Sequence, residues 1–313
     1  MTPAISAKGL TKRYGATLAL DRLDLDIATS EVYGFLGPNG AGKTTTIRLL
    51  LGIHRPTAGT VLVAGHDAWS DPVAAHRQVA YVASEPTLWP ALTGEETLDY
   101  FANLRGRCDR EYRARLVERF DFDRSKKVRA LSKGNRQKIQ LIAAFATRAD
   151  ILILDEPTSG LDPLMEAAFR LTVAETRERG QTIFLSSHVL SEVELLCDRI
   201  GLLRAGRLID QGTLAQLRHL TARTVEVTFT ESHVDVDSLR HIEGVEIATA
   251  DDHRLRLQVR GDMGRLLQAL THLPVKTLDS REPSLEEIFL VHYRSDATDD
   301  GSDRPSRHVD LMP

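Results

Sequence analysis

The sequence has little cysteine, no long apolar run and only a small net charge. Of its 313 residues only Cys108 and Cys197 are cysteines, and they stand far apart without a CxxC pattern. This scarcity argues against a disulfide framework or a cysteine-rich zinc site, and it suits a reducing cytosol. The longest apolar run, Leu141–Ala146, has six residues. A membrane-spanning helix needs about 20, so we expect no membrane crossing by this chain.

Charge balance and the amino terminus exclude further classes. Lysine and arginine total 40 against 44 aspartates and glutamates, a net charge of −4, so no basic excess demands a nucleic-acid partner. Residues Met1–Gly15 lack a charged start followed by an apolar core, and we therefore expect no secretory signal. With 42% apolar and 27% charged residues, the composition is that of a globular protein.

The first part of the chain, residues 1–218, has the rhythm of a parallel α/β domain, in which short apolar strands alternate with helical stretches. Capping patterns predict helix starts at Asp71, Thr93, Asp162 and Ser191. Strands are predicted at Leu23–Ile27, Val32–Leu36, Val61–Ala64, Val79–Ala83, Ile151–Leu154 and Thr182–Leu185.

The second part, residues 219–294, changes to the order strand, helix, strand, strand, helix, strand and a final helix. This order predicts a small ferredoxin-like α+β domain, with a helix pattern near Asp237–His241 and a capping box of Ser284 with Glu287. Aspartate, serine, glycine and proline dominate residues 295–313, for which we predict a disordered tail.

A phosphate-binding loop is predicted at Gly37–Thr44, which reads GPNGAGKT and fits GxxxxGK[ST] at every fixed position. It follows the strand Val32–Leu36 and opens the helical stretch Thr45–Leu51, as the motif requires. In such loops backbone N–H groups face phosphate oxygens, the lysine reaches the β- and γ-phosphates, and the threonine binds Mg²⁺. A chance glycine-rich turn explains the flanks less well. The predicted nucleotide-binding residues are Gly37, Pro38, Asn39, Gly40, Ala41, Gly42, Lys43, Thr44 and Thr45.

Two acids follow the apolar run Ile151–Leu154. A buried strand that ends in Asp155 suits a carboxylate that organises Mg²⁺, and Glu156 would then sit nearest the attacking water as a general base. Two acids can also simply mark the exposed end of a strand. The phosphate loop upstream favours the functional interpretation.

The segment Leu131–Gln137, which reads LSKGNRQ, stands shortly before Asp155. Together with the motifs above it resembles the signature segment of ABC-transporter ATPase subunits, whose usual form is LSGGQ. The variant is similar to that of bacterial drug and lipid exporters. The resemblance covers residues 4–218 and implies a P-loop ABC ATPase domain with an antiparallel β subdomain and a helical subdomain, and ATP and Mg²⁺ as cofactors.

The resemblance also implies contacts between two subunits. Ser132 and Gly134 would face the γ-phosphate of ATP held by a second subunit, and Ser159–Asp162 resembles the D-loop that links the two ATP sites. Ser132 also fits an ordinary N-cap of the helix Lys133–Arg148, and Asp162 a plain N-cap of the next helix. In each case both interpretations can hold together.

Two further side chains take nucleotide-binding roles by the same resemblance. Tyr14, in the segment Lys12–Gly15, is similar to the aromatic residue that stacks on adenine, although a packed aromatic at a strand end explains it too. His188 follows the strand Thr182–Leu185 and matches the switch histidine, a donor to the γ-phosphate.

One position departs from the family pattern. The family carries glutamine after a strand, touching Mg²⁺ and the membrane partner, whereas Val79–Ala83 is followed by Ser84 and Glu85. Alignment places Ser84 at the glutamine position, and either residue can serve the metal. Trp89, between prolines, fits an exposed anchor for the membrane subunit or a core residue.

Two other features have weaker implications. Residues 219–294 resemble the accessory domain of exporter ATPases, with Glu282–Phe289 similar to its typical end. Such a domain can lengthen the dimer interface, or it can regulate or dock a partner. A basic run without aromatics fits a solvated helix face better than a nucleic-acid site; it comprises Lys126, Lys127, Arg129, Lys133, Arg136 and Lys138.

The resemblance implies the cytoplasmic ATP-hydrolysing subunit of an ABC exporter, peripheral at the inner face of the cell membrane. Two copies, or one copy and a paralogue, would sandwich two MgATP and drive a separate permease. The alternative is a soluble ABC-type ATPase acting on a ribosome or nucleic acid, but such proteins commonly carry two ATPase halves or a long coiled coil. A scaffold without turnover is disfavoured by Glu156 and His188. The transported substrate is not specified by the sequence.

Overall fold

The computed structural model describes residues 3–219, 222–232, 234 and 236–294. Contacts divide the chain into two units, between Thr213 and Leu214. The expected domain boundary after residue 218 falls within helix α8 (Leu214–His219), which the contacts assign to the second unit. The tail predicted at 295–313 lies outside the described residues.

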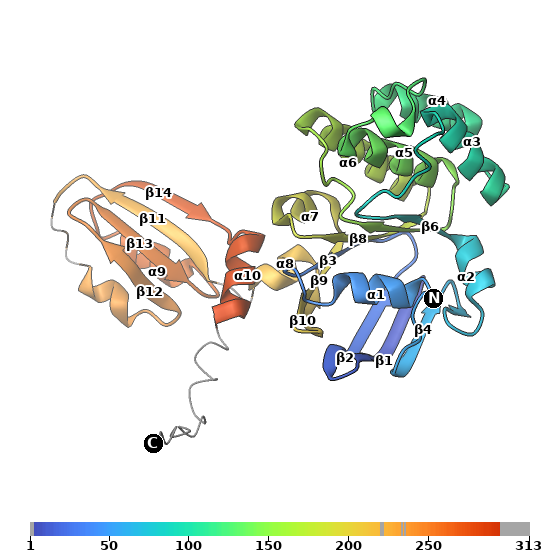
Figure 1. The fold of residues 1–313 in the computed structure, drawn as a ribbon. Coiled ribbons are helices and arrows are strands. Elements are labelled where there is room, and N and C mark those ends of the chain that lie inside the picture. Colours follow the sequence, from blue (N-terminus) through green and yellow to red (C-terminus); the bar gives the residue numbers. More distant parts are fainter. Residues whose placement is uncertain (1–2, 220–221, 233, 235, 295–313) are drawn as a thin grey trace, which may run out of the picture. The chain divides into compact units, whose positions relative to one another are not determined.

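The first unit is built around a sheet in the order β10-β9-β3-β8-β7-β6 (Figure 1). All neighbouring strands are parallel except the β9–β10 pair. Every residue of β3, β7 and β8 is buried, as expected for a parallel sheet covered on both faces. The sheet comprises β3 (Val32–Leu36), β6 (Val79–Val82), β7 (Ile151–Asp155), β8 (Thr182–Ser187), β9 (Arg199–Arg204) and β10 (Arg207–Gly212).

A second, antiparallel sheet has the order β2-β1-β4-β5. It consists of β1 (Ile5–Tyr14), β2 (Thr17–Ile27), β4 (Ala58–Val63) and β5 (His66–Asp67). On β2, Leu23, Leu25 and Ile27 are buried while Asp24 and Asp26 are exposed, which confirms the predicted alternation. One apolar core joins this sheet, helix α1 (Lys43–Leu50) and the parallel sheet, so the two sheets form a single folded unit.

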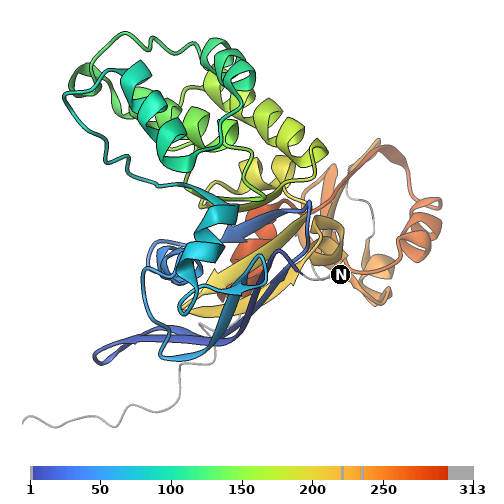
Figure 2. The same cartoon turned by 90° about the vertical axis from the view of Figure 1, so that its right-hand side faces the viewer.

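Helices complete the first unit. In Figures 1 and 2 the green helices form a lobe apart from the blue antiparallel sheet. The predicted caps at Asp71, Thr93 and Asp162 are confirmed, but the one at Ser191 is wrong, because α7 already begins at Leu190 with Val189 as its N-cap. The helices are α1 (Lys43–Leu50), α2 (Pro72–Gln78), α3 (Gly94–Arg105), α4 (Arg110–Arg119), α5 (Lys133–Ala146), α6 (Pro163–Glu178), α7 (Leu190–Leu196) and the 3₁₀ turn η1 (Val128–Ala130).

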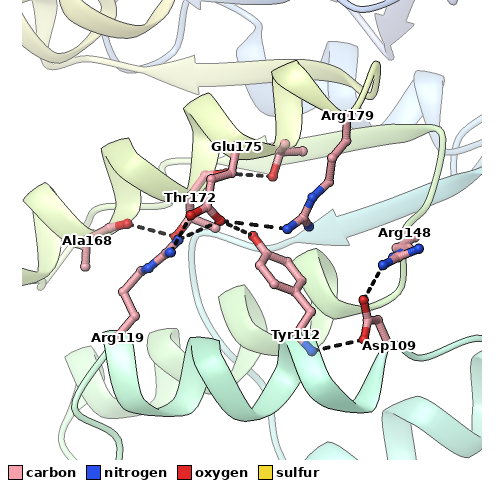
Figure 3. Close-up of polar contacts among 9 residues, drawn as sticks. Asp109, Tyr112, Arg119, Arg148, Ala168, Thr172, Glu175 and Arg179 are labelled. Atoms are coloured by element: carbon pink, nitrogen blue, oxygen red, sulfur yellow. Dashed lines mark hydrogen bonds and ion pairs between the residues drawn. The ribbon is translucent and has the colours of Figure 1, made fainter.

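A polar network fastens α4 to α6 (Figure 3). The guanidinium of Arg119 donates to both carboxylate oxygens of Glu175, at 2.5 and 2.9 Å, and to the hydroxyl of buried Thr172 at 3.1 Å. The hydroxyl of Tyr112 also donates to Glu175, at 3.2 Å, and Arg179 lies 3.7 Å over the Tyr112 ring. The hydrogen bond from Arg119 holds the pKa of Glu175 below its usual value.

The second unit has an antiparallel sheet in the order β12-β13-β11-β14 and a core of its own. The predicted β-α-β-β-α-β order is confirmed, except that the Asp237–His241 segment is a 3₁₀ helix, η2. Ser284 and Glu287 form the expected capping box. The other elements are β11 (Arg223–Phe229), β12 (Val245–Ala250), β13 (Arg254–Val259), α9 (Gly264–Leu270), β14 (Val275–Arg281) and α10 (Leu285–Arg294).

Within the ranges that the structure describes, no helix combines the length and the apolar composition that a bilayer crossing needs.

Candidate active site

A cavity of about 480 Å³ opens where the phosphate loop after β3, the end of β7 and the loop after β8 come together. In register, Leu36 is paired with Ser187 and Asp155 with Ser186, so these strands end side by side. Eleven of the residues predicted from the sequence line this cavity: Pro38, Asn39, Gly40, Gly42, Lys43, Thr44, Thr45, Ser84, Asp155, Glu156 and His188.

The phosphate loop reaches the cavity wall through a turn that only glycine tolerates. Gly42, the N-cap of α1, has φ 115°, and a Cβ there would lie 2.8 Å from Leu20 Cδ2 and 2.9 Å from the Ala19 carbonyl oxygen. Gly37 and Ala41 belong to the same loop but are not among the residues that line the cavity. The N-terminal turn of α1, with its partial positive charge, therefore lies at the wall.

Lys43 is buried and folds back onto its own loop. Its Nζ donates to the carbonyl oxygen of Gly37 at 2.5 Å and lies 3.4 Å from that of Pro38. It also lies 3.6 Å from Oε1 of Glu156. A phosphate in the cavity would be a stronger acceptor for this ammonium than two neutral carbonyls.

Asp155 is 2% exposed at the end of β7. Burial raises its pKa, the neighbouring charge of Glu156 acts in the same direction, and the hydrogen bond from Ser186 Oγ, at 2.6 Å, opposes it. A carboxylate desolvated in this way is stabilised by a nearby cation. With the hydroxyls of Thr44 and Ser84 in the same cavity, the donor set is all oxygen, which fits Mg²⁺.

No group of three or more histidine, cysteine, aspartate or glutamate side chains in the described ranges forms a metal cluster. Mg²⁺ usually keeps waters and binds one or two carboxylates together with substrate phosphates. A single buried carboxylate beside a phosphate loop is therefore enough for this ion.

Glu156 combines an unusual backbone with two side-chain contacts. Its φ is +50°, in the left-handed region, and its N–H donates to the Ser186 carbonyl oxygen at 3.0 Å. One carboxylate oxygen faces Lys43, and the other contacts Nδ1 of His188. The His188 side chain is 59% exposed, so it can reach a molecule in the cavity. The turn thus places the Glu156 carboxylate between the Lys43 ammonium and the His188 imidazole.

Tyr14 lies next to the cavity but not in its wall. It is paired with Thr17, which lines the cavity, while its hydroxyl contacts Nδ1 of His54 and the residue is 39% exposed. Tyr14 is thus a partly exposed aromatic at the end of β1, and its stacking on adenine stays a prediction.

The signature segment and the D-loop contact each other outside this cavity. Ser132 caps α5 by accepting from the N–H of Asn135 at 3.2 Å, and Asp162 caps α6. A Cβ on Gly134 would lie 2.3 Å from the carbonyl oxygen of Gly160, so the two backbones touch. The signature segment thus meets the D-loop segment, and Ser132, Gly134 and Asp162 are not among the residues that line the cavity.

The structure separates the alternatives at the position where the family carries glutamine and at Trp89. Ser84 lines the cavity, whereas Glu85 is not among its lining residues. Trp89 is 47% exposed and stacks edge-on against Tyr100 at 4.5 Å between ring centroids. The interpretation of Trp89 as a core residue is wrong.

Five further residues of the cavity wall were not predicted from the sequence. Thr17, Leu18 and Ala19 on β2, with Ala205 and Gly206 in the turn after β9, also line the cavity. The Gly206 N–H donates to the Ala41 carbonyl oxygen at 2.8 Å. No local motif marks these residues, because the tertiary fold alone brings them to the loop.

Comparisons with known proteins agree with this geometry. A family model described as ABC transporter matches residues 20–159, and a model of the ATP-binding protein DrrA1-3-like, C-terminal domain matches residues 212–293. The chain is 34% identical to the daunorubicin/doxorubicin resistance ATP-binding protein DrrA of Streptomyces peucetius, over 93% of this chain and 92% of that protein. The chain belongs to the ABC-transporter ATP-binding proteins.

Further relatives of this ABC ATPase support the assignment. The bacitracin transport ATP-binding protein BcrA of Bacillus licheniformis is 31% identical, over 93% of this chain and 97% of that protein. A solved ATP binding subunit of an ABC transporter covers 69% of the chain with a TM-score of 0.65 and 33% identity, and the match spans 92% of that structure. The dimeric post-hydrolysis ATP-binding cassette MJ0796, bound to ADP and Pi, matches in fold with a TM-score of 0.61 over 67% of this chain and 98% of its own.

The predicted family, fold and ATPase activity are thereby confirmed. The chain is an ABC ATPase whose cavity holds the phosphate loop, a buried aspartate and a strained glutamate.

Proposed function

We propose that this ABC ATPase drives export through a separate membrane permease, at the cytoplasmic face of the membrane, by closing with a second copy around two MgATP. One observation carries the proposal: Lys43 and Glu156 meet in one cavity, whereas Ser132 lies outside it. A second chain is needed to bring a signature segment to the nucleotide. The relatives named for drug resistance and bacitracin transport support export.

In this mechanism the nucleotide is bound mainly by the loop and α1. The triphosphate lies against the backbone of the phosphate loop and the N-terminus of α1, and Lys43 exchanges its carbonyl partners and Glu156 for phosphate oxygens. Thr44 and Asp155 would hold Mg²⁺, and Ser84 lines the same cavity. The ion would neutralise charge that develops on the phosphate oxygens.

Hydrolysis depends on the freed glutamate. Once Lys43 turns to phosphate, the Glu156 carboxylate is available to take a proton from the attacking water. His188, which contacts the other oxygen of Glu156, donates to the γ-phosphate from the same side of the cavity. Product release then lets the pair of chains reopen.

Dimerisation tests this proposal directly. Glu156→Gln keeps the size of the side chain but removes the proton acceptor, so the variant should accumulate as a dimer in MgATP and return to monomers in ADP. Light scattering of the purified chain measures this, with wild type in ADP as the reference. A Glu156→Gln chain that stays monomeric in saturating MgATP would contradict the proposal.

A groove in the first unit supports the permease partner. It has a volume of about 950 Å³ and lies between α2, α3 and β6, and its apolar lining residues include Leu51, Tyr81 and Leu104. Arg77, Arg105 and Arg107 line it as well, and none of its lining residues in the described ranges is acidic. Charge complementarity therefore favours an acidic, amphipathic cytoplasmic segment of the permease.

This contact has its own test. Leu104 is 68% exposed in the groove, and Leu171 is 61% exposed on α6. Leu104→Asp should lower the membrane-bound fraction of the chain several-fold in cells that contain the permease, while Leu171→Asp should not. Both variants should keep the ATPase rate of the isolated chain. Equal membrane recovery of the two variants would remove the groove from the interface.

A further inference from the structure

Glu192 makes contacts that the mechanism above does not use. It lies on α7, four residues after His188, and is partly buried. Its Oε2 accepts hydrogen bonds from the hydroxyls of Thr158, at 3.0 Å, and Ser187, at 3.2 Å. The two donors are 29 residues apart in the sequence, 187 minus 158, and meet at one oxygen atom.

Both donors adjoin residues of the active site. Thr158 stands two residues after Glu156, in the turn where the Ser159 N–H donates to the Glu156 carbonyl oxygen at 3.1 Å. Ser187 stands directly before His188 and is 1% exposed. The carboxylate of Glu192 therefore links the segment that carries Glu156 to the segment that carries His188.

The direction of these hydrogen bonds is determined at Ser187. Its Oγ accepts from the N–H of Val189 at 2.9 Å, so its proton is directed to Glu192. The carboxylate is an acceptor only, and two hydroxyl donors suit it.

Helix α7 gives Glu192 a firm position. Val193, the next residue, is fully buried, and a Cβ built on Gly34 would lie 2.5 Å from its Cγ1. Gly34 is on β3, the strand that leads into the phosphate loop. The helix that carries Glu192 is thus packed against the strand that precedes the phosphate loop.

A residue that only filled space at this place would need no hydrogen-bond acceptor. Burial raises the pKa of Glu192, its two hydrogen bonds oppose the shift, and the charges of Glu166 and Glu156 add to it. No lysine or arginine forms an ion pair with Glu192 in the described ranges. Leucine would fill such a space without the cost of a desolvated carboxylate.

We propose that Glu192 is a positioning residue. By accepting hydrogen bonds from Thr158 and Ser187, it holds the segments of Glu156 and His188 at a fixed separation, so that both side chains face the same phosphate. The inference rests on the roles of these two residues in the proposed function. Small displacements of reacting groups cost about 10²-fold in rate, whereas affinity for the triphosphate depends on the loop.

The test measures kcat and KM for ATP with the full chain. Glu192→Ala should lower kcat on the order of 10- to 100-fold and leave KM within about twofold. Glu192→Gln, whose amide oxygen still accepts from both hydroxyls, should restore most of the rate. Ser191→Ala, an exposed neighbour on the same helix, is the matched control and should behave as wild type.

A second set of variants tests the same contact if Glu192→Ala folds poorly. Thr158→Val is nearly isosteric and should lower kcat in the wild-type background but add little in Glu192→Ala, because its partner is already gone. Rates are normalised to bound MgATP, so a loss of folded chain does not count as a loss of kcat.

The outcomes separate this inference from the function it builds on. Wild-type kcat in Glu192→Ala, or full additivity with Thr158→Val, overturns the positioning role. If Glu156→Gln instead hydrolyses ATP at the wild-type rate, the proposed function itself fails. A kcat loss that Glu192→Gln does not rescue would also count against acceptance of the two hydroxyls.

Discussion

Glu156, the proposed general base, has a strained backbone conformation. A non-glycine residue with φ near +50° carries a cost of about 1–3 kcal/mol, which the surrounding structure has to offset. The N–H bond to Ser186 and the contacts to Lys43 and His188 hold this turn in place. The strain aims the carboxylate into the cavity, where a relaxed strand end would point it elsewhere.

Glu156→Gln should therefore keep ATP binding and lose hydrolysis. Glutamine preserves the shape of the side chain but cannot accept the proton of the attacking water, and loss of a general base costs about 10²–10⁴-fold in rate. Steady-state phosphate release and equilibrium ATP binding, measured on one preparation, check both halves. Turnover close to wild type would remove Glu156 from the role of base.

A second residue-scale prediction concerns the signature segment. Gly134→Ala places a methyl group 2.3 Å from the Gly160 carbonyl oxygen, so the D-loop has to move. ATP binding by the single chain should persist, while ATPase activity should fall on the order of tenfold or more. The control is Gly264→Ala at the start of α9, where a Cβ meets only the Asp262 side chain, at 3.1 Å. Equal activity of both variants would contradict the packing argument.

Among the secondary-structure elements, α4 and α6 are joined by a network of polar contacts (Figure 3). Arg119 and Tyr112 come from α4, and Glu175 and Thr172 from α6. Because Asp162 is the N-cap of α6, this network connects the predicted D-loop to α4. Partial exposure of Glu175 limits its contribution to stability.

Glu175→Gln should lower the free energy of unfolding by about 1–2 kcal/mol at neutral pH, the range for hydrogen bonds to a charged group, reduced by partial exposure. The folded pKa of Glu175 is lowered, chiefly by the hydrogen bond from Arg119. Its contribution is therefore full above the unfolded pKa and disappears as the pH falls through the folded pKa.

Urea unfolding of both chains at a series of pH values measures this difference. The gap between wild type and Glu175→Gln should shrink below about pH 4. Glu178→Gln, exposed on the same helix, is the control. A gap that does not change with pH would show that the charge of Glu175 is not what stabilises the pair of helices.

An element can be predicted from the sequence when the residues that define it are close together along the chain. The phosphate loop and the strand ending in Asp155 are contiguous motifs, and the capping box at Thr93 is a spacing of three residues, so the sequence alone places them. The cavity wall from Thr17 and Gly206 has no such signal, because strand pairing decides it. Ser191 is not the cap, because α7 begins one residue before it, at Leu190.

On the scale of the whole molecule, the cavity at the phosphate loop lies in the first unit and the small α+β domain forms the second. Every residue that lines the cavity at the phosphate loop belongs to the first unit, and the second unit has its own core. One chain also separates the two halves of the proposed catalytic site, because Lys43 is in the cavity and Ser132 is outside it. The central claim is that two chains complete each other.

A mixture of two inactive chains tests this claim most directly. Lys43→Ala damages the phosphate loop and Ser132→Arg blocks the signature segment, so each chain alone should be nearly inactive. In a mixed dimer one site carries both lesions and the other carries neither. An equal mixture should recover up to about a quarter of wild-type activity, since about half of the dimers are mixed and each has one intact site. A mixture that dimerises in MgATP yet hydrolyses no faster than the two chains apart would contradict the shared site.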